Sequence, residues 1–201
     1  MLLLLFHFLI FYAKIAVMEI INIKDTSNKL FYIGGVVRDE LLGRNSFDID
    51  ITYAGNAIEY CPRFGEVIQK NPDFGTVRIN VGGREVDFAS TRSESYPRKG
   101  HLPVVDKIGC SLREDVMRRD FTINALAKSV ATGEIVDYTG GLEDLKNKKL
   151  RVLHDESFID DPTRIIRGLK FSVRFGFELD ERTRRLQEDY LANINYDMSY
   201  K

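Results

Sequence analysis

The order of apolar and polar residues divides the chain into short strands and helices. "KLFYIGG" predicts a buried strand that ends at Gly34 and Gly35, and "VVRDELLG" predicts a short helix that ends at Gly43. "DIDITY" alternates acidic and apolar residues, which is typical of a strand. Because successive side chains of a strand point to opposite faces, Asp48 and Asp50 are expected to project from the same face.

Further strands are expected in the middle of the chain. "AIEYCPRFG" predicts a weak helix, and "FGTVRINVGGREVDFAST" predicts a hairpin that turns at Gly82 and Gly83. Segment 92–110 is rich in turn residues and is expected to form a mobile loop. Ser111 and Glu114 have the spacing of a capping box, so a helix is expected to begin there.

Helical patterns dominate the last third of the chain. "LEDLKNKKLRVL" predicts a short helix followed by a strand. Asp161 and Pro162 open "PTRIIRGLKFSVRFG", in which Ile165, Leu169 and Val173 recur at i, i+4 and i+8 and predict an apolar helix face. A last helix, "ERTRRLQEDYLANI", follows.

Composition narrows the class of protein. A chain of 201 residues can form one domain with a real core and part of a second. Its net charge of −1 gives no overall basic field, so any contact with RNA must rest on local patches. Cys61 and Cys110 have neither CxxC nor Cys/His spacing, which indicates reduced thiols, no zinc site and a cytoplasmic location.

The first seventeen residues, "MLLLLFHFLIFYAKIAV", are unusually apolar. The run is short for a bilayer span and lacks the basic start and the cleavage site of a signal peptide. A membrane anchor is one reading. A helix packed on the domain, or a start codon placed too early with Met18 as the natural start, is the favoured reading, and no membrane partner is expected.

The two aspartates of "DIDITY" suggest metal chemistry. Carboxylates on one strand face can bind one or two divalent cations through oxygen, the ligand that Mg²⁺ prefers. Asp87 in "EVDFAST" is the candidate third carboxylate, because its strand could pair beside the first, and Glu85 lies on the same face in reserve. The alternative is a solvated strand face with no ligand.

The glycine pair upstream favours the metal reading. Gly34 and Gly35 lack Cβ atoms, so their backbone can approach a phosphate at a helix N-terminus. Arg38, one turn into that helix, can add a charge-assisted hydrogen bond. Glycines, an arginine and aspartates together are typical of a nucleoside triphosphate site.

Four motifs in order resemble one family. "GGVVRD" with "DID", "RRDFTINAL", "DYTGGLEDL" and "DDPTRIIR" resemble motifs of bacterial-type tRNA CCA-adding nucleotidyltransferases and bacterial poly(A) polymerases, which are polymerase-beta-like enzymes. The resemblance covers roughly residues 29 to 185. It implies an α+β head at 29–153, with a mixed, largely antiparallel sheet flanked by helices. An apolar extension at 1–28 would precede the head, and a partial, all-helical neck at 154–201 would follow it.

The resemblance assigns roles to the acidic residues. It implies that Asp48 and Asp50 hold two catalytic Mg²⁺ ions and that Asp87 is the third catalytic carboxylate. A two-metal site can activate the 3′-hydroxyl of an RNA primer and stabilise charge on the α-phosphate.

The "RRD" motif ends a predicted helix and could reach a ribose or a phosphate. A solvated basic helix end is the alternative. The resemblance implies that Arg118, Arg119 and Asp120, with Asn124, favour the ribose 2′-hydroxyl.

The "DDPTRIIR" motif implies a site for the base. Asp161 and Arg164 could match the Watson–Crick edges of cytosine and adenine, and Arg167 belongs to the same motif. The alternative is an ordinary ion pair between residues i and i+3. The sequence departs from the family at Asp160, where glutamate is common, and at Lys170, where arginine is common.

The expected function is template-independent addition of CMP and AMP, from CTP and ATP, to an RNA 3′ end, with tRNA the first expected acceptor. Poly(A) synthesis and A-addition alone share the same motifs. A nucleotide- or RNA-binding remnant without turnover is the rival from another class. In the family the neck continues into body and tail domains that hold tRNA, so missing domains or a partner chain are expected.

Overall fold

A computed structural model of the chain describes residues 23–46 and 48–193. The predicted apolar run at the N-terminus lies outside these residues, as does the end of the predicted neck. Among the helices of the described residues, none has both the length and the apolar character that a membrane crossing requires.

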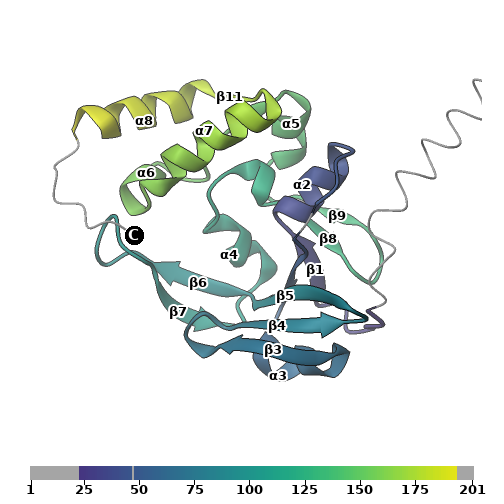
Figure 1. The fold of residues 1–201 in the computed structure, drawn as a ribbon. Helices are drawn as coiled ribbons and strands as arrows, with labels where there is room; N and C mark the ends of the chain where they lie inside the picture. Colours follow the sequence, from purple (N-terminus) through teal and green to yellow (C-terminus); the bar gives the residue numbers. More distant parts are fainter. Residues whose placement is uncertain (1–22, 47, 194–201) are drawn as a thin grey trace, which may run out of the picture.

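A seven-stranded sheet forms the centre of the molecule, in the order β3-β4-β5-β2-β1-β8-β9 (Figure 1). Only the pairing of β2 with β5 is parallel within this sheet, so the predicted mixed, largely antiparallel sheet is confirmed. The strands are β1 (Leu30–Ile33), β2 (Asp50–Tyr53), β3 (Glu66–Asn71), β4 (Thr76–Val81), β5 (Arg84–Ser90), β8 (Ala127–Ser129) and β9 (Ile135–Val136).

Helices α6, α7 and α8 gather on one side of the molecule, opposite the β3–β4 edge of the sheet (Figure 1). The α-helices are α2 (Gly35–Leu41), α3 (Ala57–Tyr60), α4 (Leu112–Met117), α5 (Gly141–Lys146), α6 (Ser157–Asp160), α7 (Thr163–Phe175) and α8 (Glu181–Ala192). Single turns of 3-10 helix occupy η1 (Cys61–Phe64), η2 (Pro72–Phe74) and η3 (Thr122–Asn124), and a short parallel pair joins β10 (Lys149–Leu150) to β11 (Glu178–Leu179).

Local sequence signals fix several of these elements. The capping box of α4 is present, because Ser111 Oγ accepts from the Glu114 N–H at 3.2 Å and Glu114 Oε2 accepts from the Ser111 N–H at 2.8 Å. The β4–β5 hairpin turns at Gly82 and Gly83, whose φ values are 61° and 88°. Both predictions are confirmed, and both rest on interactions between near neighbours in sequence.

The prediction of an irregular loop at 92–110 was wrong. Strand β6 (Arg92–Ser95) pairs antiparallel with β7 (Val104–Ile108) and forms a separate ribbon. The base of this ribbon is closed by two hydrogen bonds, from the Gly109 N–H to Thr91 O at 2.7 Å and from Thr91 Oγ1 to Cys110 O at 2.6 Å.

The predicted alternation of "DIDITY" holds only in part. Strand β2 begins at Asp50, and Asp48 lies exposed in the bend before it. Asp50 remains on the face opposite Ile51, which is fully buried.

Of the apolar stripe predicted for α7, only Ile165 packs against the core. Leu169 and Val173 are 61% and 81% exposed, whereas Arg164, Gly168 and Phe175 are buried. A Cβ on Gly168 would lie 3.0 Å from a ring carbon of Phe121, so this glycine lets the helix approach the head closely. The head therefore packs against a face of α7 that the apolar periodicity did not indicate.

Candidate active site

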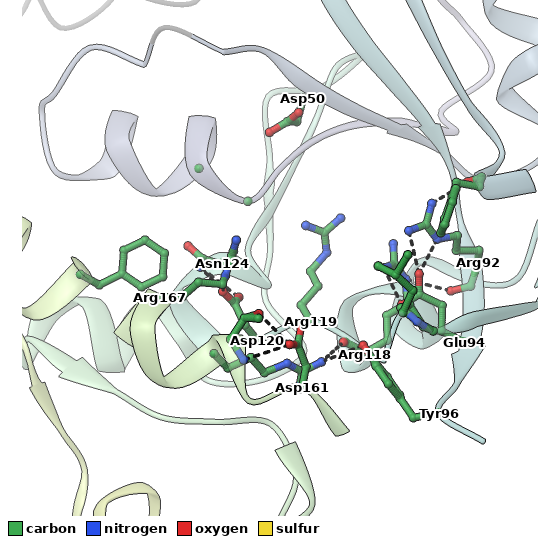
Figure 2. Close-up of a pocket in the computed structure, with 18 of the residues that line it drawn as sticks. Asp50, Arg92, Glu94, Tyr96, Arg118, Arg119, Asp120, Asn124, Asp161 and Arg167 are labelled. Atoms are coloured by element: carbon green, nitrogen blue, oxygen red, sulfur yellow. Dashed lines mark hydrogen bonds and ion pairs between the residues drawn. The ribbon is translucent and has the colours of Figure 1, made fainter. Parts of the chain in front are cut away.

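A cavity of about 730 Å³ lies where the central sheet meets α7 (Figure 2). It gathers every residue proposed from the sequence except Asp48 and Asp87. The predicted residues that line it are Gly34, Gly35, Arg38, Asp50, Arg118, Arg119, Asp120, Asn124, Asp161, Arg164 and Arg167. Three of the four motifs, which are far apart in the sequence, therefore meet at one place, and "DYTGGLEDL" contributes no residue to the lining.

Asp50 and Asp87 are direct neighbours on the parallel strands β2 and β5. Because partners in register project from the same face, the predicted pairing of these two carboxylates is present. Burial raises the pKa of the Asp50 carboxyl, and the positive charge of Arg119 opposes that rise. The negative charges of Asp87 and Asp48 raise this pKa further, so the three carboxylates are close enough to interact.

Asp87 does not point freely towards Asp50, because its carboxylate is held by Arg78 on β4. Arg78 Nε lies 2.7 Å from Asp87 Oδ1, and Nη2 lies 2.9 Å from Oδ2. Asp87 and Asp48 line a second cavity of about 390 Å³ beside the first one. The other residues of this second cavity are Ser46, Ile49, Arg78, Arg84 and Glu85.

The carboxylates suit a divalent cation in chemistry but are not gathered around one. Hard oxygen donors at Asp48, Asp50 and Asp87 are the kind that Mg²⁺ takes. Within residues 23–46 and 48–193, however, no three His, Cys, Asp or Glu side chains are arranged as a metal site. Arg78 contacts both oxygens of Asp87, and Asp48 lies in the exposed bend before β2. These carboxylates fit a divalent cation when Asp87 leaves Arg78 and binds the cation instead.

Gly34 caps the N-terminus of α2 with a φ of 72°, a conformation that favours glycine. A Cβ at this position would lie 3.2 Å from Arg119 Nη1. Arg119 reaches from the other side of the cavity towards Asp50 (Figure 2), and its buried Nε has no hydrogen-bond partner in the described structure. Gly34 and Gly35 both line the cavity, and the Arg119 guanidinium lies directly beside Gly34.

Arg38 does not project freely to a phosphate as the sequence suggested. It is 4% exposed, and its Nε and Nη2 donate to Asp39 Oδ1 at 2.9 and 2.7 Å. Its Nη1 donates to Asn124 Oδ1, and its guanidinium stacks over Phe171 and Phe175. In this arrangement Arg38 orders the neighbouring residues, because packing and hydrogen bonds hold its donors within the protein.

Asp120 connects the "RRD" motif with α7. Its Oδ2 accepts from Arg167 Nε at 2.7 Å, and its Oδ1 accepts from the Phe121 N–H at 2.7 Å and from Asn124 Nδ2 at 3.0 Å. Asn124 in turn accepts from Arg38. These residues form one continuous network, so the proposed ribose-facing side chains are held in fixed orientations.

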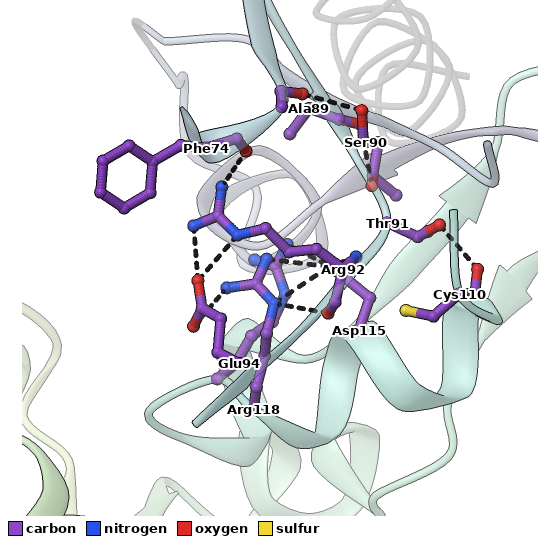
Figure 3. Close-up of polar contacts among 12 residues, drawn as sticks. Phe74, Ala89, Ser90, Thr91, Arg92, Glu94, Cys110, Asp115 and Arg118 are labelled. Atoms are coloured by element: carbon purple, nitrogen blue, oxygen red, sulfur yellow. Dashed lines mark hydrogen bonds and ion pairs between the residues drawn. The ribbon is translucent and has the colours of Figure 1, made fainter. Parts of the chain in front are cut away.

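Arg118 lies in a second network that the sequence did not indicate (Figure 3). Its guanidinium lies 2.8 Å from Asp115 Oδ1 and 3.2 Å from Glu94 Oε2. Glu94, whose side chain is 3% exposed, also pairs with Arg92 at 2.7 Å. Arg92 Nη1 donates to the backbone oxygen of Phe74, which anchors the start of β6 to η2, between β3 and β4.

The proposed base-reading pair is not a simple ion pair on one helix. Asp161 lies at the end of α6, before α7 begins, and its Oδ1 accepts from Thr163 Oγ1 at 2.6 Å. Arg164 is 3% exposed and donates to Ser157 Oγ at 2.6 Å and to Arg118 O at 3.1 Å. Asp160, which departs from the family pattern, is buried and pairs with Lys99 at 2.7 Å.

Strand β6 and the residue that follows it contribute to the cavity, which was not expected from the sequence. Arg92, Glu94 and Tyr96 all line it. Their alternate spacing, which places them on one side of a strand, was the available signal. It was obscured by the prolines and glycines that follow. Phe74, Leu102, Pro103, Thr163 and Phe171 complete the lining.

Comparison with known proteins places this geometry in a family. The family description "Poly A polymerase head domain" matches residues 30–151. An A-adding tRNA nucleotidyltransferase from Aquifex aeolicus is 47% identical over 165 residues, which cover 79% of this chain and 20% of that protein. A CCA-adding enzyme from Lactobacillus helveticus is 36% identical over 174 residues, which cover 84% of this chain and 42% of that enzyme.

Solved structures give the same relationship. A crystal structure of a tRNA nucleotidyltransferase complexed with a primer tRNA and an incoming ATP analog has a TM-score of 0.70 and 41% identity. The match covers 82% of this chain and 47% of that one. The chain thus spans less than half the length of these relatives. Its sheet, its cavity and these matches show that the chain belongs to the poly A polymerase head domain family, with A-adding and CCA-adding tRNA nucleotidyltransferases among its relatives.

Proposed function

We propose that this chain carries the nucleotide-transfer site of a template-independent RNA nucleotidyltransferase. The reaction would add CMP and AMP from CTP and ATP to an RNA 3′ end, with tRNA as the acceptor. One observation carries the proposal: a single cavity joins Asp50 and the Gly34 turn to the "RRD" motif and to α7. A triphosphate, a ribose and a base each find matching chemistry within it.

The head residues would bind the triphosphate and the ribose. The backbone at Gly34 and Gly35 lines the cavity and would contact a phosphate, and Arg119 brings positive charge to the same place. Asp120 and Asn124, fixed by their mutual hydrogen bond, offer an acceptor and a donor to the ribose hydroxyls. Arg118 would complete this group, with its orientation set by Asp115 and Glu94.

Members of this family use divalent metals. We infer two Mg²⁺ ions, held by Asp48 and Asp50, with Asp87 as the third catalytic carboxylate. When bound, such ions polarise the α-phosphate and lower the pKa of the attacking hydroxyl. Asp87, the register partner of Asp50, would accept the proton of that hydroxyl or serve as a ligand once its carboxylate leaves Arg78.

Choice of base would fall to the side chains at the start of α7. Asp161 can accept from the exocyclic amine of cytosine or adenine, and Arg164 can donate to a ring acceptor. Uracil offers no amine to the acid. Arg164 is held by Ser157 and by Arg118 O, so this donor is preorganised between neck and head.

The proposed division of the chain is an extension at 1–28, a head at 29–153 and a partial neck at 154–201. The matched head family ends at residue 151, in support of the second boundary. The RNA is expected to need further contacts, from additional domains or from a partner chain, since this chain spans only part of its relatives.

A-addition alone is the second candidate function. The A-adding enzymes from Aquifex aeolicus and Geobacter sulfurreducens are 47% and 41% identical to this chain, whereas the CCA-adding enzyme from Lactobacillus helveticus is 36% identical. Poly(A) synthesis would use the same site and differ in the number of AMP units added.

Transfer can be tested directly with labelled nucleotides. The purified chain is incubated with Mg²⁺ and either tRNA that lacks its CCA end or tRNA that ends in CC, together with labelled CTP or ATP. Incorporation of both nucleotides supports CCA addition, ATP alone on the CC-ending tRNA supports A-addition, and long A tails support poly(A) synthesis. Saturable nucleotide binding without incorporation would instead support a binding remnant.

Matched variants link any activity to the cavity. Asp50→Ala is expected to abolish incorporation. Asp189→Asn, an exposed change on α8 away from the cavity, is expected to leave it unchanged. Activity that survives Asp50→Ala would contradict the proposed site.

A further inference from the structure

The Arg78 guanidinium forms ion pairs with the carboxylates of Asp87 and Glu85. It faces Asp87 as a fork, with Nε and Nη2 each donating to a different carboxylate oxygen, at 2.7 and 2.9 Å. A third nitrogen, Nη1, lies 3.8 Å from Glu85 Oε2. Fork geometry of this kind satisfies both oxygens of a carboxylate at once.

Strand register places the two residues of this ion pair directly opposite each other. Arg78 on β4 is directly opposite Asp87 on β5, and Asp87 is directly opposite Asp50 on β2. The three side chains therefore form one row across three adjacent strands, on one face of the sheet. Asp87 sits in the middle of the row, with an arginine on one side and a carboxylate on the other.

We propose that Arg78 is a positioning residue that competes with the divalent cation for the Asp87 carboxylate. The inference rests on the proposed function, which places a cation at these aspartates. Without the cation, Arg78 neutralises Asp87 and turns it away from Asp50. A cation that binds Asp87 must displace Arg78 from that carboxylate. Arg78 therefore lowers the affinity of the carboxylates for the cation.

The competition has a physical use. Carboxylates close together repel one another, and Asp50 and Asp87 are direct neighbours in the sheet. Arg78 relieves part of this repulsion in the free protein. It thereby weakens the uptake of a lone cation and favours uptake of a cation that arrives with a triphosphate, whose oxygens supply further ligands.

Direct cation binding tests the proposal without the transfer reaction. Mn²⁺ is titrated into the protein, in the absence of nucleotide, and bound ion is measured by electron paramagnetic resonance. Arg78→Gln is expected to tighten Mn²⁺ binding by about 3- to 5-fold, the scale of an exposed ion pair with good geometry. Arg84→Gln is the matched control, because it removes the same charge from the same cavity without breaking the fork on Asp87.

A double-variant comparison identifies the shared ligand. Asp87→Asn is expected to weaken Mn²⁺ binding, and Arg78→Gln is expected to have less than a 2-fold effect in that background, because the contested carboxylate is gone. Arg78→Lys keeps the charge but loses the fork, so its affinity is expected between those of the wild type and Arg78→Gln. Arg78 and Asp87 are about 40% exposed, and circular dichroism checks that each variant is folded.

The outcomes separate the two proposals. Mn²⁺ binding that is sensitive to Asp87→Asn, with equal effects of Arg78→Gln and Arg84→Gln, overturns the role of Arg78 and leaves the proposed function standing. Wild-type protein that binds no Mn²⁺ alone, but binds it once Arg78 is changed, supports the competition strongly. Absence of Mn²⁺ binding in all variants, with and without ATP, overturns the cation site itself and the inference with it.

Discussion

The Asp120 carboxylate and the Arg167 guanidinium join the head to α7 across the cavity. Both Nε and Nη2 of Arg167 lie 2.7 Å from the same oxygen, Asp120 Oδ2. The two residues are 47 positions apart in sequence, and the acid is 7% exposed whereas the arginine side chain is 53% exposed. A buried acid of the head therefore holds a helix whose outer face is open to solvent.

Removing either partner is expected to have unequal effects. Asp120→Ala leaves the Asn124 amide and the Phe121 N–H without their acceptor, so the free energy of unfolding should fall by about 2–3 kcal/mol. Arg167→Met removes only the exposed partner and should lower it by about 1 kcal/mol or less. Urea unfolding of both variants measures the difference, and equal losses would contradict the asymmetry.

Asp115 should make stability depend on pH. Burial alone would raise its pKa, but the charges of Arg119 and Arg118, together with hydrogen bonds from Arg118 and the Arg92 N–H, hold the pKa below its ordinary value of 3.8. Its stabilising contribution is therefore complete above pH 3.8 and is lost as the pH falls through the lower folded value.

The matching variant is Asp115→Asn. At pH 7 its free energy of unfolding should be lower than that of the wild type by about 2–3 kcal/mol, because two arginines lose a buried partner. The difference should shrink as the pH falls below 3.8. Urea unfolding at pH 7, 5 and 3 checks this, with Asp189→Asn as the exposed control; a constant difference would argue against the linkage.

Asp50 should behave in the opposite way. Burial raises the pKa of this carboxyl, so the folded state binds its proton more tightly than the unfolded state does. The charged form then destabilises the fold at all pH values above the raised pKa, and the effect is absent below the ordinary value of 3.8. Asp50→Asn is expected to raise the free energy of unfolding at pH 7 by roughly 0.5–1 kcal/mol while it abolishes transfer. Thermal unfolding measures the gain, and a lower Tm for the variant at pH 7 would refute it.

Gly141 should tolerate no side chain. A Cβ there would lie 2.3 Å from the backbone oxygen of Thr122, which cannot move without disturbing η3. Gly141→Ala is expected to lower the free energy of unfolding by at least about 2–3 kcal/mol. Gly176→Ala is the control: its φ of 70° is unfavourable for alanine, but the space around it is open, so about 1 kcal/mol is expected. Urea unfolding compares the two variants, and equal losses would show that contact with Thr122 is unimportant.

Several site residues could be placed from sequence because their surroundings are local. The Gly34 turn, the capping box at Ser111 and the hairpin between β4 and β5 each depend on residues a few positions apart. Three of the family motifs supplied the rest, because their resemblance to the family was sufficient to predict a shared site. The fold class followed from the same motifs.

Other features depended on contacts that no local pattern contains. From the sequence, Arg38 is expected to bind a phosphate. Its contacts with Asn124 and Phe175 are seen only in the folded structure. The ribbon of β6 and β7 reads as a loop, because its pairing joins residues separated by prolines and glycines. The apolar periodicity of α7 predicts that Leu169 and Val173 are buried, but they are exposed, and the buried face carries Gly168.

The sequence by itself determined which charged and polar side chains this protein has, their order along the chain, and the short helices and strands that carry many of them. Only the tertiary structure decided which partner each charged group has. Hydrogen bonds and ion pairs act over a few ångströms, and strand register brings both Arg78 and Asp50 beside Asp87, whose carboxylate pairs with the opposite charge. Register is a property of the folded sheet. The acids, the arginines and the glycines therefore come together in one site only when the sheet and α7 have assembled.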